Sequence, residues 1–375
     1  MDMKTALQER AMFRDYCGDS SVSVKTQECQ DAGWLVEAIE VVKGISNSSG
    51  DLFSLKESKN RISGKMEYVI KERAKLSNGL FLLLYNQFAA ELVRLFPRYI
   101  VNPYLSSFVE NQKFFEISRL VGTPHVPIKS TPDQVKALNC YVEAIRQDAK
   151  LPSFRRLVKN FERSSNKNHK SLMGYIDDLF SKYSKVLTVR LDLEYMVDDV
   201  SYQSMGLRLL HQDVFEHRES FFIGLANHLK KLLGKSVLIG YAWKLEYGPR
   251  NGWHYHTLIF LNGQKSCEDI TIGNLVGDYW KCVTGNIGRY YNCNRDKRRY
   301  QNLGTLGIGL INHHDRDVRQ HLEGVVASYL TKVDQCVKLQ LPDGARSFGR
   351  GTMRGSGSRK GRPRSKAAIA STVES

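Results

Sequence analysis

Two histidines one residue apart are the first candidates for chemistry in this sequence. His254 and His256 lie in WHYHTLIFLNG, whose aromatic and β-branched residues predict a strand. Side chains two residues apart in a strand point to the same face, so both imidazoles would project to one side. Imidazole nitrogen is a common ligand for divalent metals, and the pair therefore predicts a metal site on one face of a sheet.

Glu246 is a candidate third ligand on the preceding predicted strand. Pro249 and the Asn251-Gly252 pair favour a tight turn, which would place Glu246 close to opposite His254. Two imidazoles and a carboxylate leave positions for water and a phosphate oxygen. Such a set suits Mg²⁺ or Mn²⁺, although imidazole also attracts zinc. The alternative is that Glu246 pairs with a neighbouring lysine or arginine at the hairpin edge.

Tyr329 and Lys332 lie in a predicted helix at about 315–335. An apolar stripe at helical spacing runs along it, formed by Val318, Leu322, Val325, Val326, Tyr329 and Val333. If this stripe packs on the histidine side of the sheet, the phenol of Tyr329 approaches the metal, and Lys332 could meet the same phosphate. The alternative is that Tyr329 is only a core tyrosine.

The elements that must position these residues begin at Val186 and follow the order β-α-β-β-α-β-α. Strands are predicted at 186–195, 236–248, 253–263 and 306–312, and helices at 214–233, 272–284 and 315–335. This order indicates an α+β fold of the split βαβ type, with an antiparallel sheet and helices on one face.

The rest of the chain reads as mostly helical. Helical spacing runs from about 64 to 96, and a polar run at 164–170 looks like a linker between two helices. The chain is therefore predicted to comprise a mostly helical accessory region at 1–130, a helical bridging segment at 131–179, the domain with the sheet at 180–345 and a disordered basic tail at 346–375.

The formal net charge of +16 suggests a polyanionic partner, with nucleic acid as the first candidate and a solvated basic surface as the alternative. Residues 346–375 hold eight lysines and arginines and one glutamate, or 8 − 1 = +7. Within this tail, the cluster most suited to phosphate contacts comprises Arg359, Lys360, Arg362 and Arg364. A Gly-Arg-Pro core like that of an AT-hook lies in the same cluster.

A second basic segment, at 290–300, combines aromatic and cationic side chains. It contains Tyr290, Tyr291, Arg295, Lys297, Arg298 and Arg299. Stacking on bases while pairing with phosphates is what single-stranded DNA binding requires, so this segment is a candidate DNA contact. The alternatives are a solvated loop and structural tyrosines.

The sequence favours a cytoplasmic protein without a membrane segment. Its seven cysteines are scattered and form no CxxC pair, its amino terminus has no signal-peptide character, and it has no long uncharged apolar run.

Taken together, the motifs resemble the HUH endonuclease superfamily. That superfamily combines an early hydrophobic strand, a His-hydrophobic-His strand and a helix bearing Tyr-x-x-Lys. The segments TVRLDLEY, GYAWKLEYGPRNGWHYHTLIFLNG, GIGLIN and YLTKVDQ are similar, in order, to inovirus and prophage replication proteins with a YagK/YfjJ-type C-terminal domain. The resemblance covers about residues 180–350.

The resemblance implies a rolling-circle replication initiator that nicks single-stranded or hairpin origin DNA. Tyr329 would attack a phosphodiester and form a 5′-phosphotyrosine bond, and the released 3′-hydroxyl would prime synthesis by a host polymerase and helicase. The implied ligands of Mg²⁺ or Mn²⁺ are His254, His256 and Glu246. Lys332 would assist as a base or a phosphate contact. Some relatives carry two tyrosines on this helix, whereas position 333 here is valine, so single-tyrosine chemistry is expected.

Two other functions stay open. Asp192 and Glu194 lie on one face of a predicted strand, as a primase-like nucleotidyltransferase with two metals would need. A non-catalytic origin-binding regulator would bind DNA without cutting it. Protein–DNA adducts, primers made from nucleotides, or binding alone would distinguish the three.

Overall fold

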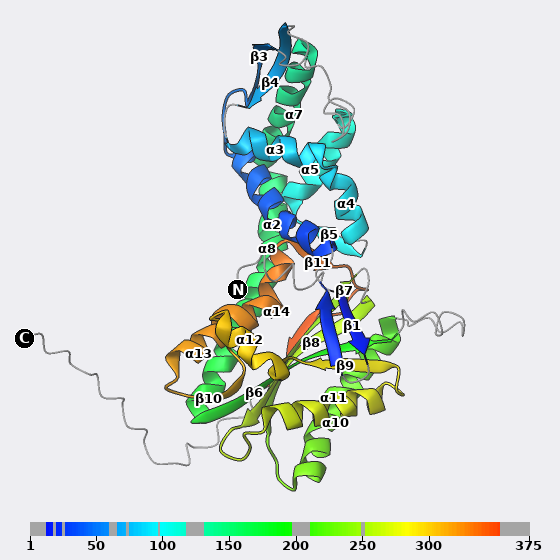
Figure 1. Ribbon diagram of the computed structural model, residues 1–375, viewed down its shortest axis with the longest axis vertical. Coiled ribbons are helices and arrows are strands. Elements are labelled where there is room, and N and C mark those ends of the chain that lie inside the picture. Colours follow the sequence, from blue (N-terminus) through cyan, green and yellow to red (C-terminus); the bar gives the residue numbers. More distant parts are fainter. Residues whose placement is uncertain are drawn as a thin grey trace, which may run out of the picture. The chain divides into compact units, whose positions relative to one another are not determined.

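A computed structural model of the chain describes residues 13–17, 20–24, 27–59, 66–72, 75–96, 98–117, 131–196, 211–248 and 252–352 (Figure 1). The chain divides into two compact units, each built from segments distant in sequence. The first comprises residues 1–168, 247–252 and 331–345, and the second comprises 169–246, 253–330 and 346–375. The predicted domain boundaries stay a prediction.

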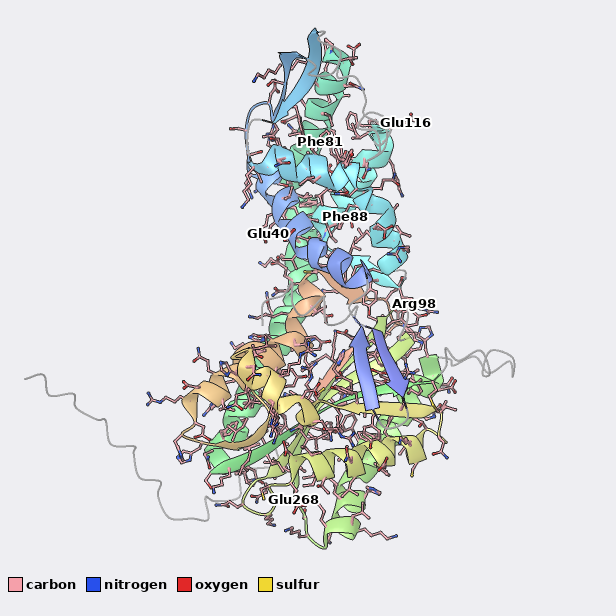
Figure 2. The ribbon with its side chains drawn as sticks, in the orientation of Figure 1. Glu40, Phe81, Phe88, Arg98, Glu116 and Glu268 are labelled. Carbon is pink, nitrogen blue, oxygen red and sulfur yellow. The ribbon has the colours of Figure 1, made fainter. Side chains whose placement is uncertain are left out.

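The first unit is built on helices. They are α2 (Gln27–Ser46), α3 (Lys75–Tyr85), α4 (Phe88–Leu95), α5 (Pro103–Phe114), α7 (Pro132–Lys150) and the first half of α8 (Pro152–Lys182). Of these, α3, α4, α5 and α7 pack against α2. Thr131 and Gln134 form a capping box that begins α7. Phe88, labelled in Figure 2, packs edge-on against Phe108 of α5, which in turn contacts Tyr141 of α7. Aromatic contacts between helices therefore fill this core.

This unit also contains strands that the sequence did not predict. The antiparallel pairs are β1 (Phe13–Cys17) with β2 (Ser20–Val24), β3 (Phe53–Lys59) with β4 (Met66–Glu72), and β5 (Tyr99–Val101) with β11 (Val337–Leu339). The prediction of a helix from 64 was wrong for 66–72. The side-chain amide of Asn139 bonds the backbone N–H and C=O of Phe53, and this contact from a distant helix supports an extended conformation.

The second unit has the predicted order of elements, with β9, α12 and β12 in addition. Its elements are β6 (Lys185–Tyr195), α10 (His211–Leu233), β7 (Leu238–Gly248), β8 (Gly252–Asn262), α11 (Asp269–Val283), β9 (Gly288–Asn292), a 3₁₀ turn (Cys293–Asp296), α12 (Lys297–Asn302), β10 (Gly309–Asn312), α13 (Arg316–His321), a π-helix (Leu322–Ala327), most of α14 (Ser328–Lys332) and β12 (Phe348–Arg350). The strands form one sheet in the order β10-β6-β8-β7-β12, with β9 also paired to β6.

The register of β6 against β8 determines which side chains share a face. The two strands are antiparallel, with Asp192 opposite His256 and Glu194 opposite His254. On the other edge of β6, Tyr291 of β9 lies opposite Asp192. Because directly opposed residues point to the same side of a sheet, all five side chains lie on one face.

The α+β class is confirmed, but helices cover both faces of the sheet rather than the one that was predicted. On one face, Tyr255 contacts Trp280 of α11, and its hydroxyl donates to a carbonyl of α10. On the other face, Phe260 contacts Tyr175 of α8. Strands β6 and β8 are buried along almost their whole length, and a strand buried on both sides needs a layer on each.

None of the helices in the described part of the chain has the length and apolar character needed to cross a bilayer.

Candidate active site

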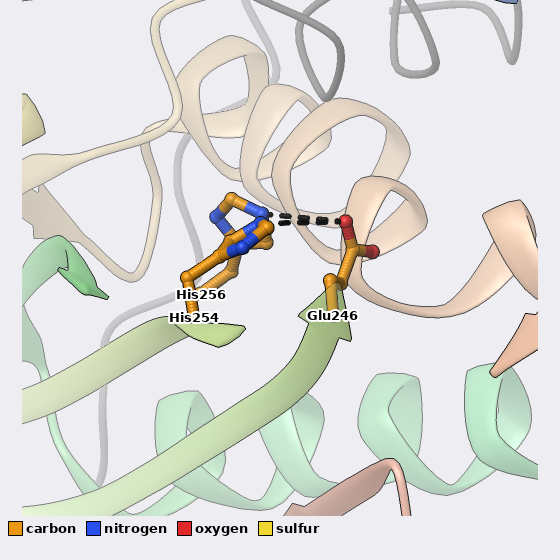
Figure 3. Close-up of side chains that lie close together, drawn as sticks. All are labelled: Glu246, His254 and His256. Atoms are coloured by element: carbon orange, nitrogen blue, oxygen red, sulfur yellow. Dashed lines mark ion pairs between the residues drawn. The ribbon is translucent and has the colours of Figure 1, made fainter. Parts of the chain in front are cut away.

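Three potential metal ligands converge at the hairpin of β7 and β8. Glu246 comes from β7, and His254 and His256 come from alternate positions of β8 (Figure 3). Oε2 of Glu246 lies 3.5 Å from Nε2 of His256 and 3.9 Å from Nε2 of His254. All three side chains are buried. Strand alternation brings the two imidazoles to one side, and the neighbouring strand brings the carboxylate to them.

This donor set fits a small divalent cation. The three ligand atoms lie within 4.8 Å of one another. Ligands about 2.1 Å from one ion lie about 3 to 4 Å apart, close to the separations seen here. Mixed imidazole and carboxylate ligation is typical of Mn²⁺, Fe²⁺ and Zn²⁺ sites, and it is compatible with Mg²⁺. A buried carboxylate beside two imidazoles also supplies the negative charge that a cation needs away from water.

The phenol of Tyr329 reaches the same cluster. Its Oη lies 2.9 Å from Nε2 of His256, and the two rings meet edge to face with centroids 4.8 Å apart. Tyr329 is buried and belongs to α14, two residues after the π-helix Leu322–Ala327. The structure therefore brings the candidate nucleophile and the candidate ligands to one place on the sheet.

Asp192 forms a hydrogen bond with the second ring nitrogen of His256, Nδ1. Its Oδ1 lies 2.7 Å from Nδ1 of that ring, and both side chains are buried. Burial lowers the pKa of His256, but the charge and hydrogen bond of Asp192, together with those of Glu246, outweigh burial and raise the pKa above its ordinary value. Asp192, His256 and Tyr329 therefore form a continuous hydrogen-bonded chain.

Arg190 is a site residue that the sequence analysis missed. Its guanidinium lies over the ring of Tyr329, 4.7 Å from the centroid, and its Nε is 3.8 Å from Oδ1 of Asp192. The segment RLDLEY contained a pattern that could have identified Arg190, because strand alternation puts Arg190 and Asp192 on one face. Only the register with β8 shows that this face is the histidine face.

Lys332 is not placed in this site. It is half-buried, ends α14 and belongs to the first compact unit, whereas Tyr329 belongs to the second. Its predicted role as a base or a phosphate contact stays a prediction.

Tyr290 and Tyr291 differ in position although they are adjacent. Tyr290 packs against Gly277 of α11 on the face away from the histidines, and Gly277 has no room for a Cβ beside that ring. Tyr291 lies on the histidine face opposite Asp192, and its hydroxyl donates to Asp296. Of the two, only Tyr291 shares a face with the candidate site.

The predicted basic cluster that follows β9 contains three exposed arginines and one lysine that is paired with a carboxylate. Arg295, Arg298 and Arg299 are exposed. Lys297 instead lies 2.8 Å from a carboxylate oxygen of Asp269, which also accepts a hydrogen bond from the buried Asn294. Lys297 thus helps to attach this segment to the sheet domain, while the three arginines face solvent. The tail residues Arg359, Lys360, Arg362 and Arg364 lie outside the described residues.

A family model described as the YagK/YfjJ C-terminal domain matches residues 154–351. The matched interval contains the whole sheet of the second unit and every residue of the candidate site. No significant match was found among curated proteins or among solved structures.

Proposed function

We propose that this chain, which belongs to the YagK/YfjJ C-terminal domain family, is a metal-dependent endonuclease that cuts one DNA strand through Tyr329. The observation that carries the proposal is the position of the Tyr329 hydroxyl, 2.9 Å from Nε2 of His256, the same nitrogen that lies 3.5 Å from the buried carboxylate of Glu246. Two imidazoles and a carboxylate on one sheet, with a phenol from the helix that packs on it, are the combination expected of an HUH-type nuclease.

The reaction would be a transesterification at phosphorus. The Tyr329 oxygen forms a bond to the phosphorus, the P–O3′ bond breaks, and the phenol proton ends on the released 3′-hydroxyl. The products are a 5′-phosphotyrosine and a free DNA 3′ end. A divalent cation held by Glu246, His254 and His256 would supply Lewis-acid polarisation of the phosphate. The guanidinium of Arg190 favours negative charge on the phenol, whose ordinary pKa is about 10.

The proposed substrate is single-stranded or hairpin origin DNA of a replicating element. The net charge of +16 and the exposed cations Arg295, Arg298 and Arg299 support a nucleic-acid partner. The free 3′ end would prime rolling-circle synthesis by a host polymerase and helicase. Because position 333 is valine, a second strand transfer would need a tyrosine from elsewhere, and Tyr291 is on the appropriate face.

The test is the formation of a covalent adduct. Full-length protein is incubated with Mn²⁺ and a pool of 3′-labelled single-stranded and hairpin oligonucleotides, and the products are separated under denaturing conditions. We expect label on the protein, lost in Tyr329→Phe and on chelation with EDTA. The matched control is Tyr255→Phe, a buried tyrosine of β8 that points to the opposite face and should keep the adduct.

The same assay separates the two alternatives. A primase-like enzyme would form no adduct and would make primers from nucleoside triphosphates. Its carboxylates would be Asp192 and Glu194, which here contact His256 and Arg289 respectively. A regulator would bind the labelled oligonucleotide on native gels, equally in wild type and Tyr329→Phe. It would carry no label under denaturing conditions. Either pattern would overturn the proposed nicking activity.

A further inference from the structure

Asp192 is a buried carboxylate to which the proposed reaction assigns no step. It lies directly opposite His256 in the β6–β8 ladder, and its Oδ1 is 2.7 Å from Nδ1 of the ring. An ionised carboxylate can only accept a hydrogen bond, so the hydrogen between the two atoms belongs to Nδ1. The position of this carboxylate therefore determines which imidazole nitrogen carries a hydrogen.

The consequence falls on the other nitrogen of the ring. A neutral imidazole with its hydrogen on Nδ1 presents a lone pair at Nε2. That atom is 3.5 Å from Oε2 of Glu246 and 2.9 Å from Oη of Tyr329. The lone pair thus points into the group of candidate ligands, where a cation would be held.

Glu194 offers an internal comparison. It lies two residues further along β6, on the same face, opposite His254 in the ladder, and it is buried like Asp192. Its carboxylate is 3.1 Å from Nε of Arg289, on β9. The two acids therefore share strand, face, burial and charge, but they contact different partners.

We propose that Asp192 is the positioning residue of the metal site, holding His256 with its hydrogen on Nδ1 so that Nε2 is available to a divalent cation. This inference rests on the metal site of the proposed function and adds a residue to it. Carboxylates that orient metal-binding histidines in this way change metal affinity by about 10- to 100-fold when they are replaced.

The first test is a calorimetric titration of Mn²⁺ into full-length protein that has been stripped of metal. We expect Asp192→Asn to bind Mn²⁺ about 10- to 100-fold more weakly than wild type, because the amide has no charge and can donate to Nδ1 instead of accepting from it. Glu194→Gln makes the same chemical change on the same face and should stay within about twofold of wild type. Equal affinity in Asp192→Asn, or an equal loss in Glu194→Gln, would overturn the assignment.

The second test reads the ring of His256 in wild-type protein, and a variant serves only to assign its signal. In wild-type protein with ¹⁵N-labelled histidine and bound Zn²⁺, long-range ¹H–¹⁵N correlation spectra identify the protonated nitrogen of each ring, and His256→Gln assigns the signal. We expect the His256 ring to keep its hydrogen on Nδ1 and to bind the metal through Nε2. Metal on Nδ1 would contradict the proposal. A wild-type protein that binds no divalent metal would instead overturn the metal site of the proposed function, so the two failures are distinguishable.

Discussion

At the scale of single residues, the site is built from side chains of three neighbouring strands. Arg190 and Asp192 come from β6, Glu246 from β7, and the two histidines from β8. Each polar group has a partner across the sheet or from the helix above it, such as Asp192 with His256 and Arg190 with Tyr329. Burying charged groups is costly unless they are paired, and here the partners are the other members of the site.

A residue-scale prediction concerns Arg190. Replacing it with leucine removes a buried cation from the ring of Tyr329, which should slow adduct formation by about 10- to 30-fold, since a desolvated cation–π contact contributes about 2 kcal/mol. The rate is measured with the 3′-labelled oligonucleotide assay. Arg218→Leu is the matched control, because that guanidinium lies 4.6 Å from the ring centroid of Trp243, which contacts Tyr255. Equal rates for the two variants would contradict a role for Arg190.

At the scale of elements, the helical segment that carries Tyr329 is interrupted by a π-helix just before that residue. The π-helix Leu322–Ala327 lies between α13 and α14. A π-turn contains one more residue than an α-turn, so it rotates everything that follows relative to what precedes it. Such turns are frequent at functional sites. The sequence predicted one regular helix here, because a stripe of apolar residues does not reveal a change of helical type.

An element-scale prediction follows from this interruption. Deleting Gly324 should convert the π-turn to α-helix and rotate Tyr329 by about 100° relative to α13, which is the angle of one residue in an α-helix. Adduct formation should be lost while circular dichroism shows that helix content is retained. Gly324→Ala is the control, since a Cβ there meets nothing within 4 Å. A deletion variant that still forms the adduct at the wild-type rate would show that the π-turn does not aim the tyrosine.

The prediction of a linker within what is one long helix was wrong for a physical reason. The polar run at 164–170 was expected to be a linker, but α8 is one helix of 31 residues from Pro152 to Lys182. Within the run, Ser165 is buried and its hydroxyl donates to the carbonyl of Thr331, while the other residues are half-buried or exposed. A helix with little apolar surface is stabilised by the contacts of its flanking turns, and composition alone does not predict it.

At the scale of the whole molecule, the charge of the chain is distributed unequally. Residues 353–375 hold six lysines and arginines and one glutamate, or 6 − 1 = +5 of the total of +16. Long-range attraction of a polyanion depends on this total, while cutting depends on the buried site. Affinity and catalysis should therefore be separable by removing the tail.

The whole-molecule prediction is a change in salt dependence. Truncation after residue 352 should weaken binding to single-stranded oligonucleotides, and the slope of log K against log salt should become shallower by about 0.7 for every phosphate that the tail had neutralised. Fluorescence anisotropy across a range of KCl concentrations measures this slope. The control is a full-length variant in which glutamine replaces Arg359, Lys360, Arg362 and Arg364, because it removes charge without shortening the chain. An unchanged slope in both variants would exclude the tail as a DNA-binding segment.

The sequence by itself determined the local features of this protein. Alternation in WHYHTLIFLNG put both histidines on one face, turn residues placed Glu246 near them, and helical spacing put Tyr329 on the packing side of its segment. Tertiary structure alone decided that Asp192 contacts His256, that Arg190 covers Tyr329, and that both faces of the sheet are covered. The reason is distance along the chain: Asp192 and His256 are 64 residues apart, and His256 and Tyr329 are 73 apart. Periodicity reports which side of its own element a residue occupies, whereas pairing between such distant residues depends on strand register and helix packing.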